Sequence, residues 1–259
     1  MSETVVDEPA PGGAAEALRL ATGVEGWLSD DQARRLWRCA AAVPPRGTIV
    51  EIGSFRGRST IVLAHAAPAG ATVVAIDPHA GGDRGPQEIA PDRARGDADL
   101  AVFRANLRRA GVDGRVRHVR RESQAALGEV AGRIDLLYID GAHRFAPALA
   151  DIVRWGARVA PGGTMLIHDA FSSVGVTLAI LAWLTPGGRF AYAGRSRSLA
   201  EYRRLPHPVA AGERLANTGA QLRELPWFGR NVAIKLALVA GRARVAAALG
   251  HRPGDPWPY

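Results

Sequence analysis

Short apolar runs alternate with helical patterns along most of the chain. The runs that predict strands are Thr48–Ile52, Thr72–Asp77, Val116–Arg120, Asp135–Asp140 and Thr164–Asp169. Apolar residues at helical spacing predict helices near Ser59–Ala67, Asp99–Ala110, Ser123–Val130 and Phe145–Val159. Strands that alternate with helices of this length predict βαβ units and a parallel sheet. Because the strands are apolar almost throughout, we expect helices on both faces of that sheet.

The expected fold class is therefore α/β, with a doubly wound, mostly parallel sheet. Three of the predicted strands end in an acid, at Asp77, Asp140 and Asp169. In open sheets of this kind, ligands bind beyond the carboxyl ends of the strands. These three acids are thus expected to converge on one crevice.

The regions outside this repeating pattern divide the chain into three parts. Residues 1–28 are rich in Ala, Gly and Pro and are expected to form a disordered leader and linker. The main domain is expected over residues 29–200, and it begins with a helix after the capping box Ser29–Gln32. A basic C-terminal extension is expected over residues 201–259. The weaker pattern after Phe171 predicts a helix near Val174–Leu184, a strand at Arg189–Ala193 and one helix at about Gly229–Leu249.

Charge and cysteine content narrow the class of protein. The net charge is +8, yet residues 1–180 carry 21 basic and 21 acidic side chains, whereas residues 181–259 carry 12 and 4. The single cysteine, Cys39, excludes a disulfide-stapled secreted scaffold. The N-terminus lacks the basic and apolar regions of a signal peptide, and no apolar run is long enough to span a membrane. We therefore expect a cytoplasmic, soluble protein.

The segment Val50–Thr60 carries the strongest chemical signal, because it lies where a strand ends and a helix begins. Gly53 and Gly57 permit a tight turn and a close approach of a ligand to the backbone, since neither has a Cβ atom. Their G-x-x-x-G spacing differs from the G-x-G-x-x-G of dinucleotide-binding folds, which argues against a dehydrogenase. Asp77 ends the next strand, where an acid accepts hydrogen bonds from a ribose diol. The alternative is a plain strand–helix turn with Asp77 as a helix cap.

Five motifs follow one another in a fixed order. They are Glu51-Ile52-Gly53, Ile76-Asp77-Pro78, Glu122-Ser123-Gln124, Tyr138-Ile139-Asp140-Gly141-Ala142-His143, and Pro161-Gly162-Gly163 before Asp169. This set resembles the class I S-adenosylmethionine-dependent methyltransferases. Within them it is similar to the small-molecule O-methyltransferases of the catechol, caffeoyl-CoA and macrolide-sugar type. The resemblance covers about residues 48–193 and implies a Rossmann-like fold.

The resemblance implies a site for S-adenosylmethionine at the strand ends. The methionine end of the cofactor would lie against the turn after the first strand, with the residues Glu51, Gly53, Ser54, Phe55, Gly57 and Ser59. Asp77 would bind the ribose hydroxyls. Ser123 and Gln124 match a Ser-Gln pair that faces the adenine, and Asp140 would border the cofactor.

The resemblance also implies a divalent-metal site, with Mg²⁺ as the candidate ion, at Asp140 and Asp169. The family often has Asn directly after the second acid as a third ligand, and this chain has Ala170 there. His143 and His168 are then candidates to replace that ligand or to act as the base. Magnesium can bind through two carboxylates with waters and substrate oxygens, whereas a histidine near neutral pKa can accept the proton itself.

We expect His143, His168 and Asp169 to carry catalysis. The alternative for His168 is a packed residue at a strand end, and the alternative for His143 is a solvent-facing helix cap. The polar, Gly-rich segment that begins at His79 delays the next helix and is expected to form a lid over the substrate.

The expected reaction is O-methylation of a small-molecule hydroxyl, on a sugar or a secondary metabolite. One alternative is an RNA ribose methyltransferase that uses the basic extension for its substrate. A second alternative is a scaffold that binds the cofactor without catalysis. The chain lacks an Asn/Asp-Pro-Pro-Tyr motif, which argues against methylation of amino groups on bases.

The basic C-terminal third leaves several partners open. Four arginines cluster around two tyrosines, as Arg195, Arg197, Arg203 and Arg204 with Tyr192 and Tyr202. They fit an Arg-rich cover or homo-oligomer contact, a site for an anionic acceptor, or a nucleic-acid patch. A membrane-surface helix is a further alternative, although the predicted C-terminal helix lacks a clean amphipathic face.

Overall fold

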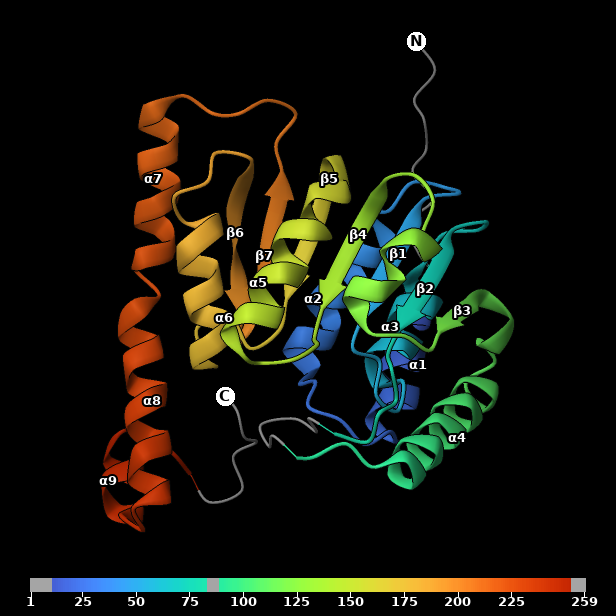
Figure 1. Cartoon of the computed structure of the whole chain (residues 1–259), viewed down its shortest axis with the longest axis horizontal. Helices are drawn as coiled ribbons and strands as arrows, with labels where there is room; N and C mark the ends of the chain where they lie inside the picture. Colours follow the sequence, from blue (N-terminus) through green and yellow to red (C-terminus); the bar gives the residue numbers. More distant parts are fainter. Residues whose placement is uncertain (1–10, 83–88, 253–259) are drawn as a thin grey trace.

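The computed structural model describes residues 11–82 and 89–252, and its centre is a seven-stranded sheet of order β3-β2-β1-β4-β5-β7-β6 (Figure 1). The strands are β1 (Thr48–Ile52), β2 (Thr72–Ile76), β3 (Val116–Val119), β4 (Ile134–Ile139), β5 (Val159–Ile167), β6 (Phe190–Ser196) and β7 (Leu199–Arg204). Strands β1 to β5 pair in parallel, and β7 is antiparallel to both β5 and β6. This confirms the expected Rossmann-like, mostly parallel sheet.

Helices cover both faces of the sheet, as the apolar strands predicted (Figure 1). On one face pack α1 (Pro11–Thr22), α2 (Asp30–Ala41), α3 (Arg58–Ala66) and α4 (Arg93–Arg109). On the other pack α5 (Phe145–Arg154), α6 (Val174–Ala179) and the π-helical turn η4 (Ile180–Leu184). Alternate strand residues face opposite layers, so Ile49 joins the first core while Val50 and Ile52 join the second.

Short helical turns complete the main domain. The 3₁₀ turns are η1 (Asp113–Arg115), η2 (Ser123–Glu129) and η3 (Gly156–Arg158). The segment expected as a helix at Ser123–Val130 is thus a 3₁₀ helix. The capping box is confirmed, since the Ser29 N–H donates to Gln32 Oε1 at 2.8 Å and the Gln32 N–H donates to Ser29 Oγ at 3.4 Å.

The N-terminal segment corrects one expectation, because residues 11–22 form helix α1 rather than a disordered leader. Ala17 and Ala21 are buried in the core that α1 shares with α3. Their small side chains let the two helices approach closely. Because we took the Ala- and Gly-rich composition as a sign of disorder, this helix was not predicted. Residues 1–10 of the expected leader lie outside the described residues.

The C-terminal part also differs from expectation. Strand β7 was not predicted and runs across the boundary that we drew after residue 200, so the sheet continues into the expected extension. Helix α7 (Ala211–Leu222) lies beside β6, and α8 (Leu225–Val239) and α9 (Ala243–Ala248) continue on the same side of the molecule beyond the end of that strand (Figure 1). The single helix expected at about Gly229–Leu249 is broken, because Gly241 adopts a φ of +67° between α8 and α9. Across the described residues no helix has the length and hydropathy to span a bilayer.

A buried acid on β7 ties the sheet to α2. Glu201 is 2% exposed, and its Oε2 accepts hydrogen bonds from Arg35 and Arg38, each at 2.6 Å. Arg203 donates to its other oxygen at 3.0 Å. Burial opposes ionisation of Glu201, but the arginines outweigh it and hold the pKa of this carboxyl below its usual value.

We expect Glu201→Ala to lower the free energy of unfolding by about 2 kcal/mol, because it leaves the half-buried guanidinium of Arg35 without its carboxylate. Urea denaturation followed by circular dichroism measures this change. Glu213→Ala, which removes an exposed acid from α7, is the matched control and should stay within about 0.5 kcal/mol of the parent. Equal stability of both variants would show that the Glu201 network contributes nothing.

Candidate active site

A cavity of about 550 Å³ lies at the carboxyl ends of β1, β2, β4 and β5. This is where the strand order reverses between β1 and β4, the usual place for a ligand in an open α/β sheet. Ten of the predicted site residues line it, namely Gly53, Ser54, Phe55, Ser59, Asp77, Ser123, Asp140, His143, His168 and Asp169. Glu51, Gly57 and Gln124 are outside its lining.

The loop after β1 is shaped by backbone contacts. Gly53 has a φ of +85°, and a Cβ atom there would lie 2.1 Å from the carbonyl oxygen of Asp140. Only glycine therefore lets this loop pass so close to the loop after β4. The N–H groups of Ser54 and Phe55 donate to Asp77 Oδ2 at 3.0 and 2.8 Å, and that of His79 donates to Oδ1 at 2.7 Å. Asp77 thus fixes the β1 loop against the β2 loop.

Two of the predicted residues act behind the cavity wall. Glu51 is fully buried, and both of its oxygens accept hydrogen bonds from the start of α3, one from Ser59 and one from Thr60 at 2.5 Å. Burial raises the pKa of Glu51 to about 8, although these hydroxyls oppose the shift. Gly57 precedes α3 with a φ of +89°, and a Cβ atom there would lie 3.2 Å from Phe103. Glu51 thus ties the start of α3 to β1, and Gly57 lets the turn before α3 pass close to α4.

Asp151 is a cavity residue that the sequence analysis missed. This acid on α5 is buried, and its Oδ1 accepts hydrogen bonds from Ser123 Oγ at 2.5 Å and from Gln124 Nε2 at 2.6 Å. Burial raises the pKa of Asp151, while the two donors oppose that shift. Its only sequence signal is an acid on the otherwise apolar face of α5 with Ala148 and Ile152.

Four side chains from the ends of β4 and β5 form what we call the acid–histidine cluster: Asp140, His143, His168 and Asp169. His143 Nε2 lies 2.9 Å from Asp169 Oδ2. His168 Nδ1 lies 3.1 Å from Asp140 Oδ1 and 3.4 Å from Asp169 Oδ2. The Tyr138 hydroxyl donates to Asp140 Oδ2 at 2.8 Å. The sequence-based expectation that the strand-end acids converge is therefore confirmed for Asp140 and Asp169.

The cluster balances its own charge. Burial works against the charged form of His168, but the carboxylates of Asp140 and Asp169 outweigh it and raise the pKa of His168 well above its usual value. The same balance raises the pKa of His143, through Asp169. Burial is likewise overcome at Asp169, where the two imidazoles hold the pKa far below its usual range. Among the described residues, Asp169 Oδ1 and His168 Nε2 have no hydrogen-bond partner.

The N-terminal linker forms a further part of the wall. Residues 25–28, which we had expected to be disordered, line the cavity. The Trp27 ring lies 5.7 Å from that of Phe55 between centroids, and Arg58 donates to the carbonyl oxygen of Gly26 at 2.9 Å. Residues 79–82 and 89–91 of the expected lid also line the cavity, whereas its residues 83–88 lie outside the described residues.

The aromatic and basic cluster of the C-terminal third is engaged within the protein. Arg195 Nε donates to Glu224 at 2.7 Å, and its guanidinium carbon lies 3.8 Å from the centre of the Trp227 ring. The Tyr192 hydroxyl donates to the same carboxylate at 2.9 Å, and Tyr202 is fully buried. These rings are therefore not an open surface on which bases could stack.

Comparison with known proteins agrees with this geometry. Residues 50–170 match a family model described as a methyltransferase domain. The fold is similar to that of cofactor-bound Rv0187 from MTB, with 24% identity, a TM-score of 0.54, and coverage of 79% of this chain and 93% of that chain.

Two further solved structures are described as O-methyltransferases. The one from Bacillus cereus in complex with SAH has 17% identity, a TM-score of 0.52, and coverage of 76% of this chain and 92% of that chain. TomG from Streptomyces achromogenes, involved in tomaymycin synthesis and in complex with SAM, has 17% identity, a TM-score of 0.50, and coverage of 74% and 87%.

The close approach of Gly53 to the Asp140 backbone allows a test of whether the cavity binds the cofactor. We expect Gly53→Ala to weaken binding of S-adenosylhomocysteine at least about tenfold, because the new Cβ would overlap the Asp140 backbone and displace the loop. Isothermal titration calorimetry measures the dissociation constant. Gly212→Ala on α7 is the matched control, since a Cβ there meets nothing within 4 Å. Equal affinity of the two variants would mean that the Gly53 loop is not part of the binding site.

Proposed function

We propose that the chain is a class I S-adenosylmethionine-dependent methyltransferase and that its acceptor is the hydroxyl oxygen of a small molecule. The observation that carries this proposal is the acid–histidine cluster, which lies in the same cavity as the Gly53 loop and Asp77. Methyl transfer from a sulfonium needs mainly positioning and exclusion of water, because the cofactor carries the activated group. A hydroxyl acceptor also needs its proton removed, and the cluster supplies groups for that step.

The cofactor is assigned to the cavity wall formed by the β1, β2 and β4 loops. Gly53, Ser54 and Phe55 would face its methionine end, and Asp140 would border it. Asp77 Oδ2 accepts from two backbone N–H groups, whereas Oδ1 accepts from one and keeps a lone pair for a ribose hydroxyl. Ser123 lines the adenine side, where Gln124 and Asp151 orient it. Glu51, Gly57 and Ser59 then act through the position of α3.

His143 is the base in this proposal. Its Nε2 faces Asp169 Oδ2 at 2.9 Å, so the carboxylate favours a proton on Nε2 and leaves Nδ1 as the acceptor. After transfer of the acceptor's proton, Asp169 stabilises the imidazolium. His168 sits between Asp140 and Asp169 and offsets their mutual repulsion.

The same residues also fit a divalent cation. Asp140, His143 and Asp169 each offer one ligand atom, and these atoms lie within 4.8 Å of one another. Asp169 Oδ1 has no hydrogen-bond partner among the described residues, which leaves an oxygen for a ligand. His143 would then take the place of the ligand missing at Ala170, as the third donor. A bound cation would supply positive charge next to the acceptor oxygen.

The acceptor is small in this proposal because the cavity must hold it together with the cofactor. Arg144 lines the cavity and is the candidate group for recognising an anionic acceptor. The RNA alternative loses part of its support, since Tyr192 and Arg195 are engaged with Glu224 and Trp227, and Tyr202 lies in the core.

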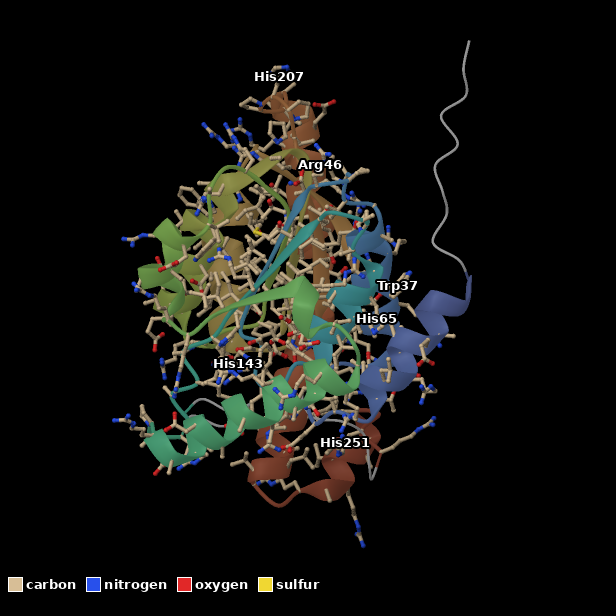
Figure 2. The ribbon with its side chains drawn as sticks, turned by 90° about the vertical axis from the view of Figure 1, so that its right-hand side faces the viewer. Trp37, Arg46, His65, His143, His207 and His251 are labelled. Carbon is tan, nitrogen blue, oxygen red and sulfur yellow. The ribbon has the colours of Figure 1, made fainter. Side chains whose placement is uncertain are left out.

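Substitutions at His143 and Asp169 test the assignment of the base. We expect His143→Ala and Asp169→Asn to lower turnover at least about 100-fold while the affinity for S-adenosylhomocysteine changes less than about threefold. Turnover is followed as S-adenosylhomocysteine formed on catechols and hydroxylated glycosides. His207→Ala is the control, since His207 is exposed and lies at the end of the molecule away from His143 (Figure 2). Parental turnover in Asp169→Asn would contradict the assignment.

Chelation separates the two roles of His143. If His143 is the base, turnover after dialysis against EDTA should stay within about twofold of the untreated enzyme, because proton transfer to a neutral imidazole requires no cation. The measurement is the initial rate with and without added Mg²⁺ or Mn²⁺. A fall of about tenfold or more that either ion restores would instead make Asp140, His143 and Asp169 metal ligands.

A further inference from the structure

The loop that carries Asp169 has a backbone that its sequence disfavours. Asp169 and Phe171 have φ angles of +55° and +56°, in the left-handed region that non-glycine residues rarely occupy. Such conformations persist where surrounding contacts determine them. The Phe171 side chain is fully buried and meets the Tyr192 ring edge-on, with centroids 6.1 Å apart. Hydrogen bonds to the carbonyl groups of this loop are therefore expected to help hold its backbone in this conformation.

Helix α8 of the C-terminal part supplies two such contacts. Asn231 Nδ2 donates to the Phe171 carbonyl oxygen at 3.5 Å, and Lys235 Nζ donates to the Ser172 carbonyl oxygen at 2.9 Å. The two donors are four residues apart and so lie on one face of α8. They engage the consecutive carbonyl groups of Phe171 and Ser172, two and three residues after Asp169. Asn231 is fully buried and Lys235 is half-buried.

The same loop also holds the backbone of His143. Ser173 Oγ donates to the His143 carbonyl oxygen at 3.4 Å. At Gly175 the approach is closer still, since a Cβ atom there would lie 2.2 Å from that oxygen. A shift of the loop would therefore move Asp169 and His143 together and alter the 2.9 Å contact between them.

Lys235 differs chemically from the other cations of the chain. It is the only lysine among 33 basic residues. An ammonium group is a compact charge with three donors, whereas a guanidinium is a planar fork. Burial lowers the pKa of Lys235 below its usual value, whereas the Asp169 carboxylate acts in the opposite direction and favours the charged ammonium. Lys235 thus forms a hydrogen bond with the loop and is also attracted to the Asp169 carboxylate that the loop carries.

We propose that Asn231 and Lys235 are positioning residues, through which α8 holds the Asp169–Ser173 loop in the conformation that sets Asp169 against His143. The C-terminal part is on this basis a component of the catalytic apparatus. The predicted effect on turnover rests on the function proposed above, whereas the predicted effect on the His143–Asp169 contact does not.

The test uses the full chain with S-adenosylhomocysteine bound and compares Lys235→Met, Lys235→Arg and Arg244→Met. Histidine side-chain ¹H–¹⁵N spectra report the His143 Nε2–H that faces Asp169, and His143→Ala assigns that signal. In Lys235→Met we expect the signal to shift or disappear and kcat to fall at least about tenfold, with KM and S-adenosylhomocysteine affinity changed less than about threefold. Lys235→Arg should restore part of both readouts, because it keeps a charged donor, although a planar guanidinium does not reproduce the compact ammonium group. Arg244→Met removes an exposed cation from α9 and should match the parent.

Two outcomes would overturn the proposal. One is a parental His143 signal and parental kcat in Lys235→Met. The other is that Lys235→Met lowers the melting temperature while the His143 signal and kcat, both measured well below that temperature, match the parent. Lys235 would then only stabilise the fold. If Lys235→Met does not fold, Lys235→Gln decides by the same two measurements. If the parent protein methylates no hydroxyl, the function proposed above fails, and the His143 signal alone decides the role of Lys235.

Discussion

The close approach of two loop backbones at Gly53 and Asp140 is the constraint on which the cavity depends. A Cβ atom at Gly53 would lie 2.1 Å from the Asp140 carbonyl oxygen, so the β1 and β4 loops pack with no side chain between them. Asp77 then joins the β1 loop to the β2 loop through backbone N–H groups. These contacts involve backbone and one carboxylate, so the chain's own groups hold the wall together. A wall held by such contacts reduces the ordering that binding must impose.

Charge compensation is the second condition for the site. Two carboxylates at adjacent strand ends would repel each other in a buried setting, and here each faces an imidazole. This arrangement explains why both histidines carry raised pKa values in spite of burial. It also links the chemistry to the fold, because His168 and Asp169 are consecutive residues at the end of β5. The backbone at Asp169 has a φ of +55°, and the Asp169 carboxylate lies against both imidazoles.

The sequence predicted those parts of the fold in which the local residue pattern matches the surroundings of the residues in the folded chain. Strand β1 was predicted to the residue, and the capping box at Ser29 was recognised, because apolar runs and capping chemistry are local signals. Strand β7 was missed because its arginines resemble a surface segment, although Glu201 compensates Arg203 and Arg204 donates to a carbonyl oxygen. The role of Glu51 was also misjudged, since a strand-end acid faces either a ligand or a helix start according to packing that sequence does not reveal. Asp151 gave almost no signal for the same reason.

The excess of basic residues in the C-terminal third is explained by the contacts that these side chains make within the protein. In a sequence, a run of arginines with aromatic residues suggests an external anion, because nothing shows what faces them. In the folded chain Arg195 lies between Glu224 and Trp227, Arg204 donates to the Gly156 carbonyl oxygen at 3.0 Å, and Arg230 donates to that of Leu249 at 2.7 Å. Carbonyl oxygens accept these hydrogen bonds without adding negative charge, so a net positive charge accumulates while the cations serve internal structure. Net charge by itself is therefore weak evidence for a nucleic-acid partner here, and the position of each cation decides its role.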